Sequence, residues 1–293
     1  RNFSSGRFEG ASKISGETIN KVCKERGGKG MTGHNCSPGC VVKCSNVYPK
    51  KDGNELVSVQ EYESVWSLGA NCGIDNLDFT GELIWLCNDY GLDTIEAGVT
   101  LGVAMEAGLA SFGDGKKAIA LLHEIGKGTP LGHILGSGAA VTAATYGVVR
   151  CPTTKGQGMP AYEPRPIKGI GVTYATSTMG ADHTSGYTIA PEILGVSGKL
   201  DPFNTSKAKV SRAFQDTTAF IDSTGHCLFI SFAILDIPSG LEGLMEECNG
   251  VLGTKWKVED AGRIGGEIVA IERAFNKAAG FTKQDDRIPE FMT

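Results

Sequence analysis

The sequence lacks three features that would assign it to large classes of protein. Acidic side chains number 33 against 28 lysines and arginines, so a net charge of −5 gives no electrostatic footprint for nucleic acid. No apolar run approaches the ~20 residues that cross a bilayer. Residues 1–10 lack the apolar segment of a signal peptide. We therefore expect partners other than nucleic acid or a membrane.

The cysteines lack the repeating spacing of a secreted disulfide framework, and their number, nine, is odd. A reducing, cytoplasmic setting with a bound metal or cluster fits them better. Glycine is abundant instead, since 41 of 293 residues is about twice the usual ~7%. Such a chain makes many tight turns, or lets its backbone come very close to another group.

Helical patterns dominate the chain. Asp75 can cap a helix that ends at Gly91, and Asp93 with Glu96 resembles a capping box that opens the next helix. Pro130 fits the first turn of another helix. Further helical patterns cover residues 116–128, 206–222 and 258–280.

A stretch rich in proline and glycine, residues 151–169, interrupts the helical patterns and is the natural boundary inside the chain. Convincing period-2 strands are scarce. Residues 227–235 fit either a strand or a buried helix, because periodicity cannot decide for a short apolar run. We expect a mainly α protein with two helical subdomains, residues 1–160 and 161–293.

Three cysteines, Cys36, Cys40 and Cys44, lie within nine residues, and Pro38 with Gly39 between them indicates a loop. Thiolate ligands suit zinc or an iron–sulfur cluster, and both need a fourth ligand. For zinc the local candidate is His34. The distant candidates are Cys23, Cys72, Cys87, Cys151, Cys227 and Cys248.

Two hexapeptides far apart in the sequence fit one loose pattern, [D/N]-x-x-G-x-[D/C]. Residues 88–93 read Asn-Asp-Tyr-Gly-Leu-Asp, and residues 222–227 read Asp-Ser-Thr-Gly-His-Cys. Each lies where a helical pattern ends, so either alone fits an ordinary helix cap. Together with the cysteine triplet they resemble the aldehyde:ferredoxin oxidoreductase family, tungsten–pterin enzymes that bind their pterins with two such motifs.

The resemblance runs almost from end to end, through residues 1–8, 61–76, 161–183 and 272–290. Members of that family are considerably longer and have an N-terminal β-rich domain. The resemblance therefore implies that this chain is the helical middle and C-terminal portion of such an enzyme.

The resemblance also implies roles for individual residues, carried over by position. The ligands of a [4Fe–4S] cluster would be Cys36, Cys40, Cys44 and Cys227. The pterin-binding set would be Asn88, Asp89, Gly91, Asp93, Asp222 and Gly225. Residues 1–160 would thus hold the cluster loop and the first pterin motif, and residues 161–293 the second motif and the fourth cysteine.

Glu63 and His183 match the two residues that this family places beside the metal. A carboxylate there can orient or deprotonate a water molecule near the aldehyde carbon. Taken alone, Glu63 would more often lie on a solvated helix face, and His183 would more often be structural.

The implied reaction is oxidation of a small aldehyde to a carboxylic acid, with water as the oxygen source. Its cofactors would be a tungsten or molybdenum bis-pterin and the [4Fe–4S] cluster, which passes electrons to ferredoxin. The sequence contains no E-x-x-H motif, which some members use to bind a metal between subunits, so we expect no such site. Dimerisation itself is left open.

Three other interpretations remain. In the first, the chain belongs to a related tungsten enzyme that reduces aromatic acyl thioesters. An electron-transfer module would carry an iron–sulfur cluster alone. A helical interaction domain would be stapled by zinc on the three loop cysteines and His34. Tungsten with iron, iron alone, or zinc in a metal analysis would separate these interpretations.

Overall fold

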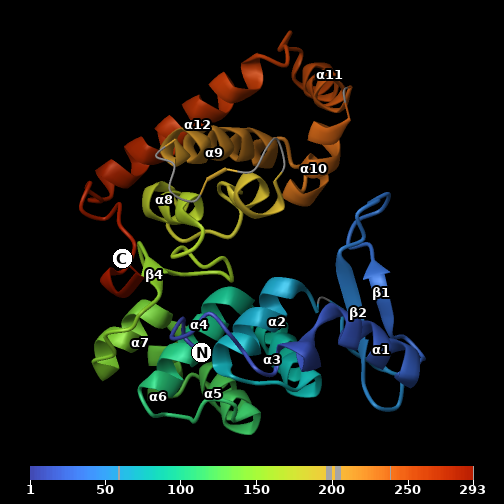
Figure 1. Cartoon of the computed structure of the whole chain (residues 1–293), viewed down its shortest axis with the longest axis vertical. Helices are drawn as coiled ribbons and strands as arrows, with labels where there is room; N and C mark the ends of the chain where they lie inside the picture. Colours follow the sequence, from blue (N-terminus) through green and yellow to red (C-terminus); the bar gives the residue numbers. More distant parts are fainter. Residues whose placement is uncertain (59, 196–199, 202–205, 238, 293) are drawn as a thin grey trace. The chain divides into compact units, whose positions relative to one another are not determined.

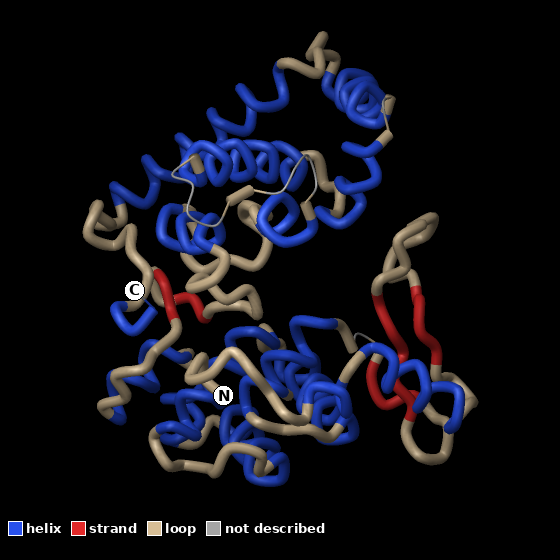
Figure 2. Tube along the Cα trace, viewed as in Figure 1, coloured by secondary structure: helices blue, strands red, loops and turns tan. Residues whose placement is uncertain are grey.

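The computed structural model describes residues 1–58, 60–195, 200–201, 206–237 and 239–292. The chain divides into two compact units, Arg1–Ala161 and Tyr162–Thr293. Helices dominate both units (Figure 1), and strands are confined to short segments (Figure 2). The predicted mainly helical fold is confirmed.

The first unit packs helices beside a small antiparallel sheet. Its helical segments are η1 (Ala11–Ile14), α1 (Gly16–Arg26), α2 (Tyr62–Leu68), η2 (Ala70–Cys72), α3 (Leu77–Tyr90), α4 (Thr94–Glu106), α5 (Gly115–Lys127), α6 (Pro130–Gly136) and α7 (Ala139–Tyr146). Its strands are β1 (Met31–His34), β2 (Ser45–Pro49), β3 (Glu55–Val57), β4 (Thr153–Thr154) and β5 (Gln157–Gly158). Strands β1, β2 and β3 form one sheet in that order, and β4 pairs with β5.

Local sequence signals set the ends of these helices. Gly91 takes a left-handed conformation, with φ of 68°, and ends α3, while Asp93 accepts the Glu96 N–H and opens α4. The predicted helix end at Gly91 and the cap at Asp93 are confirmed. The Glu96 side chain does not complete a capping box, because its two oxygens accept the N–H groups of Ala139 and Gly158. The predicted cap at Asp75 is wrong by one residue, because Asn76 stands directly before the first helical residue and accepts two backbone N–H groups. Asp75 instead pairs with Lys13.

The core of the first unit lies among α2, α3, α4 and α5. Leu68, Leu83, Ile84, Leu101 and Leu122 are each at most 2% exposed and belong to one apolar cluster. Helices α2 and α4 come very close, since a methyl group at Gly98 would lie 2.5 Å from the side chain of Ser67. Abundant glycine is thus used for close backbone approach.

The second unit consists of helices and their connections. These are α8 (Lys168–Thr176), the π-helix η3 (Ala190–Leu194), α9 (Lys207–Ser223), α10 (Leu228–Asp236), α11 (Gly240–Leu252), α12 (Asp260–Ala278) and η4 (Glu290–Met292). The sequence left residues 227–235 as either a strand or a helix. In the structure they form helix α10 almost entirely, and this helix packs on α9 and α11. Throughout the described residues, no helix combines the length and apolar character needed to cross a membrane.

Helices α9 and α12 lie side by side and share an extensive contact (Figure 1). A methyl group on Gly265 of α12 would overlap the backbone carbonyl of Asp216 on α9. A backbone carbonyl cannot rotate away as a side chain can. The two helices therefore depend on a glycine at this position.

We expect Gly265→Ala to lower the free energy of unfolding of the intact protein by about 1–3 kcal/mol, the usual cost of overpacking. Gly262→Ala lies on the same helix, where an added methyl group meets nothing within 4 Å. This control should raise the free energy by about 0.5–1 kcal/mol through helix propensity. Denaturant titration measures both, and equal effects of the two substitutions would contradict the packing argument.

Candidate functional site

The three loop cysteines lie at the tip of the hairpin formed by β1 and β2. His34 pairs with Ser45 at the last rung of the sheet, so the fold anchors both ends of the loop between them. Within it, Cys36 and Cys44 are exposed and Cys40 is half-buried. The loop is thus held at its base and presents its thiols to the surroundings.

Accessibility separates these cysteines from those in the core. Cys72 and Cys87 are fully buried, and loss of solvation raises the pKa of each thiol to about 12. Burial likewise raises the pKa of Cys23. Burial makes the thiolate form of these three side chains more costly, so they are poorer candidates for metal ligands than the accessible loop cysteines.

The three thiols of the loop could supply part of the ligand set of a metal ion or cluster that is bound by thiolates. Three thiols on a short loop can approach one centre only if the backbone turns tightly, and Gly39 has a φ of 78° beside Pro38. Within the described residues, no three His, Cys, Asp or Glu side chains are already gathered to hold a metal ion. The loop therefore supplies suitable ligands without being a preformed cage.

The first hexapeptide is the turn between α3 and α4. Asn88 and Asp89 lie in the last turn of α3, and both side chains are exposed. The Gly91 N–H bonds back to the carbonyls of Cys87 and Asn88, which closes the helix end. Asp93 Oδ1 accepts the Glu96 N–H at 2.7 Å, so this acid has a structural role as the cap of α4.

The second hexapeptide occupies the same kind of position, between α9 and α10. Asp222 lies in the last turn of α9, and Gly225 turns the chain with φ of 80°. Cys227 is exposed and stands directly before Leu228, the first residue of α10. Cys227 belongs to the second unit, so its approach to the loop cysteines stays a prediction.

Asp222 is also electrostatically unusual. Although the residue is exposed at the surface, desolvation by neighbouring atoms raises the pKa of its carboxyl group, and the nearby carboxylates of Asp182 and Glu272 raise it further. Such a group gains from a ligand that donates N–H groups to it. The role in pterin binding that the resemblance implies for Asp222 stays a prediction.

Glu63 lies on α2 and is only 8% exposed, which is unusual for a carboxylate. Its Oε2 accepts the backbone N–H of Ala161 at 2.9 Å. Burial raises the pKa of Glu63 from 4.5 to about 7, against the opposing effect of that hydrogen bond. A group that is half-ionised near neutral pH is suited to accept and return a proton. The alternative prediction, that Glu63 lies on a solvated helix face, is wrong.

His183 lies between α8 and η3, in a cluster of aromatic rings. Its ring stacks on Tyr162, with centroids 5.5 Å apart, and its Nε2 is 3.2 Å from the Tyr187 hydroxyl. The two tyrosine hydroxyls are 2.5 Å apart. This network fixes the imidazole orientation. Tyr162 and Tyr187 escaped the sequence analysis, because single aromatic residues in loops follow no periodic pattern.

The family to which the chain belongs is identified by comparing residues 1–293 with known protein families. A family profile described as "Aldehyde ferredoxin oxidoreductase, domains 2 & 3" matches residues 1–293. The chain belongs to the aldehyde ferredoxin oxidoreductase family and carries these two domains. This confirms the resemblance inferred from the sequence.

Several proteins similar to this chain have names that include tungsten. The chain is 35% identical to a "Tungsten-containing aldehyde ferredoxin oxidoreductase" of Pyrococcus abyssi and 34% identical to one of Pyrococcus furiosus, each match covering 99% of this chain and 49% of the relative. It is also 27% identical to an "Aliphatic sulfonate oxidoreductase, WOR-like subunit" of Pyrococcus furiosus, over 86% of this chain and 42% of that protein. The chain thus spans about half the length of the curated relatives it matches.

The raised pKa of Glu63 predicts a pH-dependent stability. Unfolding restores a pKa near 4.5, so between pH 4.5 and about 7 the unfolded chain loses a proton that the folded protein keeps. The stabilising contribution is therefore complete below pH 4.5 and is lost as pH rises through 7.

We expect the free energy of unfolding of the wild-type protein, relative to Glu63→Gln, to fall by about 2–3 kcal/mol between pH 4.5 and pH 8. Glutamine imitates the protonated carboxyl group and does not titrate. Denaturant titrations of both proteins at several pH values give this difference. A difference that stays constant across the range would show that Glu63 ionises normally.

Proposed function

We propose that the intact protein oxidises small aldehydes to carboxylic acids and passes the electrons to ferredoxin. Membership of the family and the names of its relatives support this reaction class. Two features of the chain carry the proposal: the set of accessible thiols, Cys36, Cys40, Cys44 and Cys227, and the presence in each unit of one matching helix–helix turn. We also propose a cytoplasmic location, because accessible thiols persist in reducing compartments.

Two groups of residues would hold the cofactors. The four cysteines would ligate a [4Fe–4S] cluster, with Cys227 as the fourth ligand. The two hexapeptide turns would bind a tungsten or molybdenum bis-pterin through Asn88, Asp89, Asp93 and Asp222, with Gly91 and Gly225 allowing the backbone to approach. When bound, these cofactors supply the chemistry of removing two electrons from a hydrated carbonyl and releasing them singly.

The protein's own residues would manage protons. Oxidation of an aldehyde by water releases two protons with the two electrons, so a nearby base must take them up. Glu63 has the pKa for this, and its burial keeps the carboxyl group away from bulk water. His183, held by Tyr162 and Tyr187, would orient the substrate or relay a proton.

The likeness to a sulfonate oxidoreductase subunit supports the same redox class with a different substrate. Reduction of acyl thioesters, an isolated electron-transfer module and a zinc-stapled domain have no supporting observation of their own. Metal analysis of the intact protein tests the proposal directly. Tungsten or molybdenum together with iron is expected, and zinc alone would overturn it.

Cys227→Ala should lose the iron–sulfur cluster or leave a labile three-iron species, because each iron site needs its thiolate. Iron content and the visible spectrum of the purified protein report this. Cys248→Ala is the matched control, a half-buried cysteine of the same unit outside both motifs. Full iron and an unchanged spectrum in Cys227→Ala would remove Cys227 from the ligand set.

Glu63→Gln should lower aldehyde turnover by about 10²–10⁴-fold, the usual contribution of a general acid–base group. Metal and iron contents should stay normal, because the substitution keeps the shape of the side chain. Steady-state kinetics with several aldehydes measure the effect. His183→Asn should lower turnover in the same way. Turnover near that of the wild type in Glu63→Gln would exclude the proton-transfer role.

A further inference from the structure

A buried ion pair in the second unit, Glu192 with Lys207, has no part in the candidate site described above. Lys207 Nζ donates to Glu192 Oε1, and the two side chains are 4% and 5% exposed. Taking two charges out of water is costly, and an apolar pair of similar volume is often as stable as a buried ion pair. We therefore looked for a role of this pair other than stability.

The pair joins three helical segments. Glu192 lies in η3, and Lys207 is the first residue of α9. The backbone N–H of Gly169, in the first turn of α8, donates to both oxygens of Glu192, at 3.0 and 3.1 Å. The contact is close, since a methyl group on Gly169 would lie 2.5 Å from Glu192 Oε2. One carboxylate thus ties η3 to the starts of α8 and α9.

The connection between α8 and η3, residues 177–189, carries His183. The start of this connection is fixed on α12. Thr178 donates its hydroxyl to Glu272 Oε2, and its carbonyl accepts the side-chain N–H of Asn276, each at 2.7 Å. The start is therefore held independently of the ion pair.

The end of the same connection is held by η3. The Glu192 N–H donates to the Thr188 carbonyl at 3.1 Å, and the Ala190 N–H donates to the Tyr187 carbonyl at 3.2 Å. Because the Glu192 side chain is in turn held by Lys207, the backbone position of Tyr187 depends on the ion pair.

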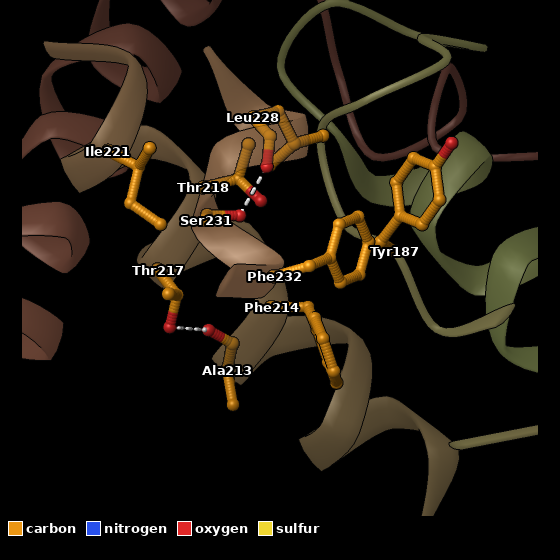
Figure 3. A pocket seen from close by; sticks show the side chains of 9 residues that line it. All are labelled: Tyr187, Ala213, Phe214, Thr217, Thr218, Ile221, Leu228, Ser231 and Phe232. Atoms are coloured by element: carbon orange, nitrogen blue, oxygen red, sulfur yellow. Dashed lines mark hydrogen bonds between the residues drawn. The ribbon is translucent and has the colours of Figure 1, made fainter. Parts of the chain in front are cut away.

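Tyr187 passes this position on to the imidazole of His183. Its ring packs edge to face on Phe232 of α10, with centroids 5.7 Å apart, and its hydroxyl points away from that contact (Figure 3). The hydroxyl lies 3.2 Å from His183 Nε2. A shift of the Tyr187 backbone therefore changes the contact that orients the imidazole.

We propose that Glu192 and Lys207 are positioning residues for His183. Their ion pair fixes the end of the connection 177–189 and so holds the Tyr187 hydroxyl against the imidazole. Misplacing a reacting group by about 1 Å can cost about 10²-fold in rate, so a buried ion pair is well used in fixing one. As a role in catalysis, the assignment rests on the function proposed above. As a determinant of the orientation of His183, it stands on these contacts alone.

The double substitution Glu192→Met with Lys207→Met, in the intact protein, tests the assignment. It removes both charges together, so no buried charge is left unpaired and the protein should fold. It also removes the acceptor of the Gly169 N–H, which frees η3 from α8. We expect the imidazole ¹⁵N resonances of His183, assigned by their absence from His183→Asn, to move or broaden. Aldehyde turnover should fall by about 10–10²-fold.

A single substitution tests the same assignment with both charges kept. Gly169→Ala places a methyl group against the Glu192 carboxylate and displaces it, so the His183 resonances should again change. This variant decides the question if the double methionine variant does not fold.

Two further variants serve as controls. Glu192→Gln with Lys207→Met is the conservative pair, because the glutamine oxygen can still accept the Gly169 N–H. It should keep the His183 resonances and the turnover close to those of the wild type. Arg212→Met removes a cation from the more exposed ion pair of Arg212 with Asp216 on the same helix, and it should change neither quantity.

His183 resonances at their wild-type positions in both the double methionine variant and Gly169→Ala would overturn the proposal. An equal change in Arg212→Met would also overturn it. If the resonances move as expected but the wild-type protein oxidises no aldehyde, the positioning role stands and the proposed function fails. If the wild type and the double methionine variant oxidise aldehydes equally well, with unchanged resonances, the positioning role fails and the proposed function stands.

Discussion

The close packing of α2 on α4 is the contact on which the first unit depends. Gly98 lets the α2 backbone approach, and Ser67 then donates its hydroxyl to the carbonyl of Thr94 at 2.9 Å. The same helix α4 begins at Asp93, inside the first hexapeptide, and its Glu96 accepts the backbone N–H groups of Ala139 and Gly158. One helix thus fixes the start of the hexapeptide turn, the position of α2 and the chain that leads toward Ala161.

Burial of Glu63 is a consequence of this arrangement. Because α2 is held against α4, its inward face cannot turn to solvent, and the carboxyl group meets the Ala161 N–H in place of water. Loss of hydration moves its pKa toward neutrality. The second unit orients His183 differently, by stacking and hydrogen bonds from tyrosines. Each unit therefore carries one candidate proton group and one hexapeptide turn.

Features of the fold that depend on a few neighbouring residues are predictable from the sequence. Helix ends at Gly91 and Asp93 depend on a few neighbouring residues, and their patterns are visible in the sequence. The burial of Glu63 is not visible there, because its partner lies 98 residues away. The stacking of Tyr162 on His183 likewise joins two separate segments of the chain. Roles for the four cysteines come from family resemblance and stay predictions.

The proposed proton transfer depends on a carboxyl group of Glu63 that is partly protonated at neutral pH. Titration of the intact protein with ¹³C-labelled glutamate, followed by carboxyl NMR and assigned with Glu63→Gln, measures this group alone. We expect one glutamate resonance with a midpoint near pH 7, and we expect it to be absent from the variant. If every glutamate resonance titrates near its ordinary value of 4.5, the buried proton carrier does not exist and the proposed proton transfer fails.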